Sequence, residues 1–197
     1  MALDAPAYLK SYGAPIAIWF ILSVALTQPQ YSVISGILQT VFIMAWTYFG
    51  HIFAHMISES PPLNYINTHV SMHHDSSGKW PRALNLIVEA ISNSLGFGIL
   101  LIVQWLLGIE LLSTSLVLFA GLLYVFIHIL DYSILGNHEH RLHHTKTFCN
   151  YAPDFMDVAF GTRCEPDAPY YNQNREIVHA AAAFLIVWIA KKKYDLK

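Results

Sequence analysis

Four long apolar runs, arranged as two pairs, dominate the pattern of hydrophobic and polar positions along this chain. The first pair covers residues 14–27 and 31–57, and only a short polar break separates its two members. The second pair covers residues 95–107 and 111–130. Because a helix of about 20 apolar residues crosses a bilayer, the pattern predicts an all-α integral membrane protein with about four transmembrane helices in two hairpins.

Polar segments follow each hairpin, and we expect them to form a cytosolic, histidine-rich helical cap. The single membrane domain, 1–197, would then consist of hairpin 14–57, cytosolic segment 58–94, hairpin 95–130 and cytosolic segment 131–197. Residues 83–94 are expected to form an interfacial helix. The apolar run 177–190 has only fourteen residues, so we expect a packed or interfacial helix there, not a fifth span.

The composition agrees with a protein that is solvated mostly by lipid. Of 197 residues, 55% are hydrophobic and 12% are charged, whereas soluble domains carry about 25% charged residues. The net charge of −2 and the lack of a basic tract with interleaved aromatic residues give no reason to expect nucleic acid as a partner. Cys149 and Cys164 show no CxxC spacing, so we expect two reduced thiols that face the cytosol.

The distribution of Lys and Arg predicts the orientation. Two hairpins would place both termini and both polar segments on one side of the membrane. That side would carry Lys10, Lys79, Arg82, Arg141, Lys146, Arg163, Arg175 and the triplet Lys191–Lys193, while the opposite turns have no Lys or Arg. The positive-inside rule then puts the histidine face in the cytosol. The membrane would be the endoplasmic reticulum in a eukaryote and the inner membrane in a bacterium.

Histidines are concentrated at the ends of the apolar runs. Ten of the eleven fall in four places, namely His51 and His55; His69, His73 and His74; His128; and His138, His140, His143 and His144. Neutral imidazole is the commonest side-chain metal ligand. On a helix, residues four apart share a face, which applies to 51 with 55, 69 with 73, and 140 with 144. The remaining histidine, His179, stands alone and is expected to be structural.

Such a number of imidazoles exceeds what one metal ion needs. A tetrahedral zinc site takes at most four ligands, so eight or more at one membrane surface imply two metal ions, with iron or zinc as the candidates. Glu59, Asp75 and Glu89 are near enough in sequence to accept ring N–H groups. A non-redox zinc protein and a scaffold that has lost activity stay open as alternatives.

These motifs resemble those of the fatty acid hydroxylase/sterol desaturase superfamily of membrane di-iron oxygenases. The matching elements are GHIFAH, HVSMHH, HRLHH, the pair Asn150 and Tyr151, and MDVAFGT at 156–162. The segment IHILDYS around His128 is similar to the one that precedes the last box in sterol methyl oxidases. Together the elements cover about residues 45–165.

The resemblance implies a lipid oxidation. Its site residues would be metal ligands that act through the metals, namely His51, His55, His69, His73, His74, His128, His140, His143 and His144, with His138 as a further metal candidate outside the HxxHH core. Asn150 and Asp157 would support the site, and Gly161 would close the tail at a turn.

The implied reaction is an O2-dependent hydroxylation or desaturation of a fatty acyl, sphingoid or sterol C–H bond. The cofactors would be two iron ions, which zinc can replace in purified protein. Electrons would come from a separate carrier such as cytochrome b5 or ferredoxin, because the sequence has no fused haem motif.

Two features depart from the family pattern. The middle box is HxxxHH, where HxxHH is commoner, so His69 or His73 is expected to be displaced. In addition, residues 85–88 lack the histidine that many relatives carry before the position of Glu89. The altered middle box supports the alternative that the chain is a non-catalytic scaffold. The missing histidine would leave the site a ligand short unless water completes it.

Overall fold

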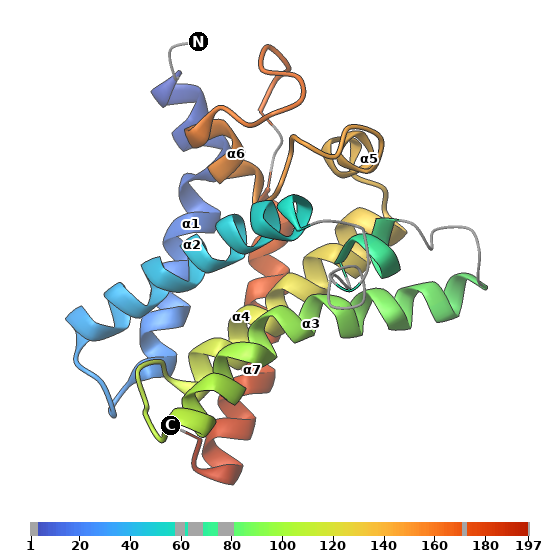
Figure 1. Ribbon diagram of the computed structural model, residues 1–197. Coiled ribbons are helices and arrows are strands. Elements are labelled where there is room, and N and C mark those ends of the chain that lie inside the picture. The colour runs from blue at the N-terminus through green and yellow to red at the C-terminus, as the bar shows by residue number, and fades with distance from the viewer. Residues whose placement is uncertain (1–3, 58–61, 63–68, 75–80, 171–172, 197) are drawn as a thin grey trace.

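The computed structural model describes residues 4–57, 62, 69–74, 81–170 and 173–196, and these residues form helices and no strand (Figure 1). In chain order the elements are α1 (Ala5–Thr27), α2 (Val33–Met56), the π-helix η2 (His69–His74), α3 (Arg82–Leu107), α4 (Thr114–Phe126), the π-helix η3 (Ile127–Ile134), α5 (His138–Thr145), α6 (Asp154–Phe160) and α7 (Asn174–Tyr194). The predicted all-α fold is confirmed.

Four of these helices are long and apolar enough to cross a membrane. They are α1, α2, α3 and the continuous unit of α4 with η3, residues 114–134. A turn at 28–32 joins α1 to α2, and a turn at 108–113 joins α3 to α4. Gly108 ends α3 with a φ of +63°, a left-handed conformation that glycine adopts without steric cost. The prediction of about four spans is confirmed.

Two helix boundaries differ from the predicted ones. The first helix begins at Ala5, nine residues before the apolar run, because the Asp4 carboxylate accepts a hydrogen bond from the Ala7 N–H (3.2 Å) and caps it. The third is one helix from Arg82 to Leu107, so the separate interfacial helix expected at 83–94 is wrong. The polar residues at 92–94 do not break it; the Ser94 hydroxyl donates to the Ala90 carbonyl of the preceding turn (2.7 Å).

Helix α7 runs along the bundle, packed against α1 and α4. Its small residues Ala180 and Ala183 are completely buried there. At its far end the Lys191 ammonium donates to the carbonyl oxygens of Leu26 and Gln28 and to Gln30 Oε1. The C-terminal end of α7 therefore lies beside the α1–α2 turn.

This position corrects part of the predicted topology. The N-terminal end of α1 lies beside α6, because the Tyr8 hydroxyl donates to the Phe155 carbonyl (3.2 Å). The two ends of the chain are therefore at opposite ends of the bundle (Figure 1). The triplet Lys191–Lys193, expected on the histidine side, lies at the other end. The apolar run of α7 is too short to indicate this, but 21 residues of helix extend about 32 Å.

The buried core lies between α1, α4 and α7, and it includes Leu26, Leu116, Phe119, Leu123 and Val187. The outer faces of the spans expose large apolar side chains such as Ile34, Leu38, Phe53 and Trp105, as expected for surfaces that contact lipid. This core holds the spans so that the ends of α2 and η3 and the start of α3 meet at one end of the bundle.

We predict that Lys191→Met lowers stability, because it removes the donor that joins α7 to the α1–α2 turn. Loss of a charged donor to buried carbonyls should cost about 1–3 kcal/mol, and thermal unfolding of the detergent-solubilised protein would measure it. The matched control is Lys192→Met, since Lys192 is exposed and lies 6.0 Å from the Trp188 ring centroid. Equal melting temperatures for the two variants would contradict the role of Lys191.

Candidate metal centre

Five histidines from three elements converge at one end of the bundle, and we call them the main histidine cluster. They are His51 and His55 of α2, His69 and His74 of η2, and His143 of α5, and one ring nitrogen from each lies within 4.8 Å of all the others. The Nε2 atom of His143 is 3.1 Å from Nε2 of both His51 and His55. The Nε2 atom of His69 is 3.1 Å from that of His55 and 3.2 Å from that of His74.

These separations fit a shared cation. Nitrogen ligands bound at about 2.0–2.1 Å to one metal ion lie roughly 3.0–3.4 Å from each other. A hydrogen bond needs one donor for each acceptor, yet His143 Nε2 faces two other Nε2 atoms at the same distance. Convergence of five ring nitrogens on one point is therefore better explained by a bound metal ion than by hydrogen bonds among the rings.

The backbone fixes which nitrogen of His143 points inward. Its Nδ1 lies 2.7 Å from the carbonyl oxygen of Cys149, so Nδ1 carries the proton and Nε2 keeps its lone pair for a metal. Burial lowers the pKa of His143 to about 3 and that of His74 to about 2. Both rings are therefore neutral at pH 7, the form that binds a metal.

The unusual spacing of the middle box is explained by the π-helix η2. In a π-helix the hydrogen bonds run from residue i to residue i+5, so positions five apart lie on one face. His69 and His74 are five apart, and their Nε2 atoms lie 3.2 Å from each other. The sequence predicted a pair four apart, His69 with His73, but the side chain of His73 lies outside the described part of the structure. The extra residue of HxxxHH thus still allows two histidines to face the site.

Three further histidines, the adjacent trio, lie beside the main cluster. His140 and His144 of α5 have their Nε2 atoms 2.9 Å apart, as their spacing of four predicts. His128 of η3 is completely buried, its ring centroid is 5.2 Å from that of His140, and its Nδ1 lies 3.2 Å from the Tyr124 carbonyl. The rings of His144 and His74 stack at 4.4 Å, so the two groups adjoin.

Two of the chain's histidines lie apart from both groups. The ring of His138 is mostly exposed, and its Nε2 lies 3.2 Å from the Glu165 carboxylate. His179 lies 2.9 Å from the Asp131 carboxylate, which agrees with the structural role expected for it. Of the acids considered as partners, Glu89 accepts hydrogen bonds from the Ser133 hydroxyl (2.7 and 2.8 Å), whereas Glu59 and Asp75 lie outside the described residues.

The loop after α5 is held by the Asp157 carboxylate. This carboxylate accepts hydrogen bonds from the backbone N–H groups of Tyr151 (2.9 Å) and Ala152 (2.7 Å) and from the Thr162 hydroxyl (2.6 Å). Burial nevertheless raises the pKa of Asp157 to about 7. Ala152 has a φ of +56°, a strained conformation for a residue with a side chain. Asp157 therefore stabilises the backbone that places the Cys149 carbonyl against His143.

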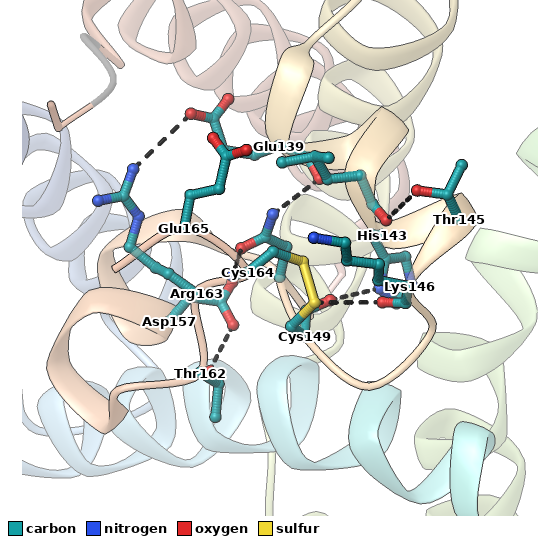
Figure 2. The surroundings of a disulfide bond; sticks show 12 residues. Glu139, His143, Thr145, Lys146, Cys149, Asp157, Thr162, Arg163, Cys164 and Glu165 are labelled. Carbon is teal, nitrogen blue, oxygen red and sulfur yellow. Dashed lines mark hydrogen bonds and ion pairs between the residues drawn. A yellow bond between two sulfur atoms is a disulfide. The ribbon is translucent and has the colours of Figure 1, made fainter. Parts of the chain in front are cut away.

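The same loop contains a disulfide, shown in Figure 2, between Cys149 and Cys164. The two cysteines, 15 residues apart, are brought together because Asn150 pairs with the tail: its N–H donates to the Thr162 carbonyl (2.8 Å) and its Oδ1 accepts from the Cys164 N–H (2.9 Å). The expectation of two reduced thiols is therefore wrong. Sequence spacing could not reveal the pair, since the contact depends on how the loop folds back.

An apolar groove lies between α2 and α3 beside the main cluster. His51 and His69 line it, and the exposed side chains Phe53, Leu95 and Ile99 also line it at the lipid-facing surface. Its cavity volume is about 390 Å³, within the roughly 300–1,000 Å³ of typical ligand pockets. A lipid chain could therefore reach the histidines sideways from the bilayer.

Aromatic residues around the cluster were largely missed by the sequence reasoning. The Tyr151 ring centroid lies 5.8 Å from that of His51 and 5.9 Å from those of His55 and His143. The Tyr132 ring stacks on His140 at 4.5 Å. Both carried a signal in the family motifs, since Tyr151 directly follows Asn150 and Tyr132 lies in the segment IHILDYS.

We predict that Asp157→Ala destabilises the loop, because it leaves two buried N–H groups and a hydroxyl without their acceptor. The expected loss is about 2–4 kcal/mol, seen as a lower melting temperature and faster proteolysis after α5. Asp167→Ala is the control, since Asp167 is an exposed acid in the same segment. An unchanged melting temperature for Asp157→Ala would show that the loop does not depend on this carboxylate.

Comparison with known proteins gives one match. Residues 13–162 match the family model described as fatty acid hydroxylase. The match includes every residue of the main histidine cluster and of the adjacent trio, and it confirms the resemblance drawn from the histidine boxes. No curated protein and no solved structure matches the chain significantly.

Proposed function

This chain belongs to the fatty acid hydroxylase family, and on that basis we propose that it is an O2-dependent oxidoreductase that hydroxylates or desaturates a lipid C–H bond. The lipid would be a fatty acyl, sphingoid or sterol compound. The observation that carries the proposal is the convergence of five ring nitrogens within 4.8 Å beside a groove open to the bilayer.

We further propose that the site holds two iron ions. The main histidine cluster would hold one, and the adjacent trio would contribute to the other. Bound iron supplies the O2-dependent oxidising chemistry that protein side chains lack. The contribution of the chain is to fix the ligands, as the Cys149 carbonyl does for His143 and the Tyr124 carbonyl does for His128.

The groove gives the substrate its position in this proposal. His51 and His69 belong both to the cluster and to the groove wall, so a C–H bond of a chain lying in the groove would be next to the metal ligands. The apolar lining excludes water from the reacting bond. Hydroxylation and desaturation need the same placement of the C–H bond. Hydroxylation would transfer an oxygen atom to the carbon, whereas desaturation would remove a second hydrogen.

Electrons would come from a separate carrier such as cytochrome b5 or ferredoxin. Arg141 and Lys146 are exposed at the histidine end, and the apolar ring of Phe148 nearby is 76% exposed. A cationic surface with an exposed aromatic residue suits a transient complex with an acidic partner, because charge complementarity raises the association rate.

The first test is the metal content of detergent-purified protein made with ample iron. We expect about two irons per chain in the wild type, at most one in His143→Ala, and loss of lipid oxidation in that variant. His138→Ala, on the same helix but exposed, should keep both irons. Less than half a metal per chain after reconstitution with ferrous iron would favour the alternative, a non-catalytic or zinc-binding scaffold.

We propose that the histidine end faces the cytosol of a multi-pass protein, in the endoplasmic reticulum of a eukaryote or the inner membrane of a bacterium. Five exposed cations lie at that end, namely Lys10, Arg82, Arg141, Lys146 and Arg175, against Lys192 and Lys193 at the other. The excess supports this orientation by the positive-inside rule. The Cys149–Cys164 disulfide at the same end is the observation against this orientation, because cytosolic disulfides are rare.

Labelling of introduced cysteines tests the orientation. In a Cys149→Ser, Cys164→Ser background expressed in bacteria, a membrane-impermeant maleimide should label Glu110→Cys in intact cells, because the α3–α4 turn would face the periplasm. Arg141→Cys should be labelled only after permeabilisation. The reverse pattern would place the histidine end outside the cytosol, where the disulfide would persist.

A further inference from the structure

One buried amide in the groove is used by neither the metal site nor the fold. Asn93 of α3 lines the groove together with His51 and His69, and its side chain is only 5% exposed. Its amide nitrogen is buried and has no hydrogen-bond acceptor among the residues that the structure describes. A buried donor without an acceptor is unfavourable, so its presence in an apolar groove points to an occupant that accepts a hydrogen bond.

Two other polar side chains on the walls differ from Asn93. The Thr47 hydroxyl is engaged, because it donates to the Ile43 carbonyl within its own helix (2.8 Å). Tyr124 also lines the groove, but, apart from the histidines, the Asn93 amide is the lining group whose buried nitrogen has no acceptor among the described residues. The torsion of an asparagine amide is broadly distributed, so a side-chain rotation can aim the N–H at an occupant.

The groove has a defined far end. The Trp46 indole N–H donates to the Gly96 carbonyl (2.9 Å) and bridges α2 to α3. Asn93 lies three residues before Gly96, about 4.5 Å along the helix axis. On α2 the lining residues run from Trp46 to Ile57, a rise of about 16 Å. The donor therefore lies in the groove between the Trp46–Gly96 bridge and the histidines.

We propose that Asn93 binds the oxygen of a single-chain lipid, a carbonyl or hydroxyl group, and so positions the substrate of the reaction proposed above, on which this inference rests. The exposed apolar residues Phe53, Leu95 and Ile99 admit the chain from the bilayer, and Asn93 distinguishes an oxygenated lipid from a plain hydrocarbon. A site built to hydrogen-bond a ligand rejects an analogue that lacks the group, because the buried donor then stays unsatisfied.

The test is a binding measurement on the purified full-length protein in detergent, without an electron donor, so that no turnover occurs. The probe is tritiated methyl octadecanoate, whose ester carbonyl only accepts hydrogen bonds, and scintillation proximity reports its binding. Unlabelled octadecane serves as the competitor without an oxygen. Asn93→Leu should weaken binding of the ester roughly 3- to 10-fold, the equivalent of one hydrogen bond, and leave competition by octadecane unchanged.

Two further variants complete the test. Asn93→Ala removes the same donor and leaves a smaller side chain, so it should weaken ester binding as Asn93→Leu does. If one of the two variants folds poorly, the other still tests the proposal. Ser94→Ala is the matched control, because Ser94 is an exposed polar neighbour on α3 that bonds to its own helix, and it should bind the ester as the wild type does.

Unchanged ester affinity in both Asn93 variants would overturn the proposal. A parallel loss of ester and octadecane binding would do so too, since it would reflect a damaged groove and not a lost donor. The assay needs no turnover. A protein that fails to oxidise lipid can therefore still confirm the role of Asn93, and a failed binding test leaves the metal assignment intact.

Discussion

Lone pairs of neutral imidazoles directed at one point are the constraint on which the rest of this structure depends. The Nε2 atom of His143 lies 3.1 Å from the Nε2 atoms of both His51 and His55. Burial lowers the pKa of His143, so its ring carries no second proton to donate to either neighbour. Such an arrangement is unfavourable without a cation at its centre, since the lone pairs of neutral rings would face one another. The fold must therefore hold the rings in place from outside.

That support comes from backbone groups more than from side chains. Carbonyl oxygens of Cys149 and Tyr124 engage the Nδ1 atoms of His143 and His128. The loop that presents the first of them has a strained residue, Ala152, whose N–H is bonded by Asp157. Local strain of order 1–3 kcal/mol is tolerated at sites where the surroundings compensate for it. The Tyr48 hydroxyl, 2.6 Å from the Thr162 hydroxyl, extends this support from the loop to α2.

The features that could be predicted from the sequence were those that repeat with the period of a regular helix. Apolar runs gave the spans, and spacings of four gave the pairs His51 with His55 and His140 with His144. The π-helix η2 was not predictable, because its i to i+5 pattern is rare and the sequence carries no period for it. The side of the lysine triplet was missed for a related reason. The apolar part of α7 is short, and only its packing on α1 and α4 shows how far the helix extends. The Cys149–Cys164 contact depends on the hydrogen bonds of Asn150, which spacing does not encode.

The groove and the candidate metal site both place polar side chains inside an apolar helix bundle, and they differ in what would satisfy those side chains. In the cluster, five imidazoles would share one cation, which would satisfy the ring nitrogens that converge there. In the groove, a single amide lies among apolar walls, and an occupant with an oxygen would satisfy it. His51 and His69 belong to both environments, which is why a ligand bound by its oxygen at Asn93 would also be held against the metal ligands. In this proposal the groove wall would both select the lipid, through Asn93, and place its C–H bond beside His51 and His69.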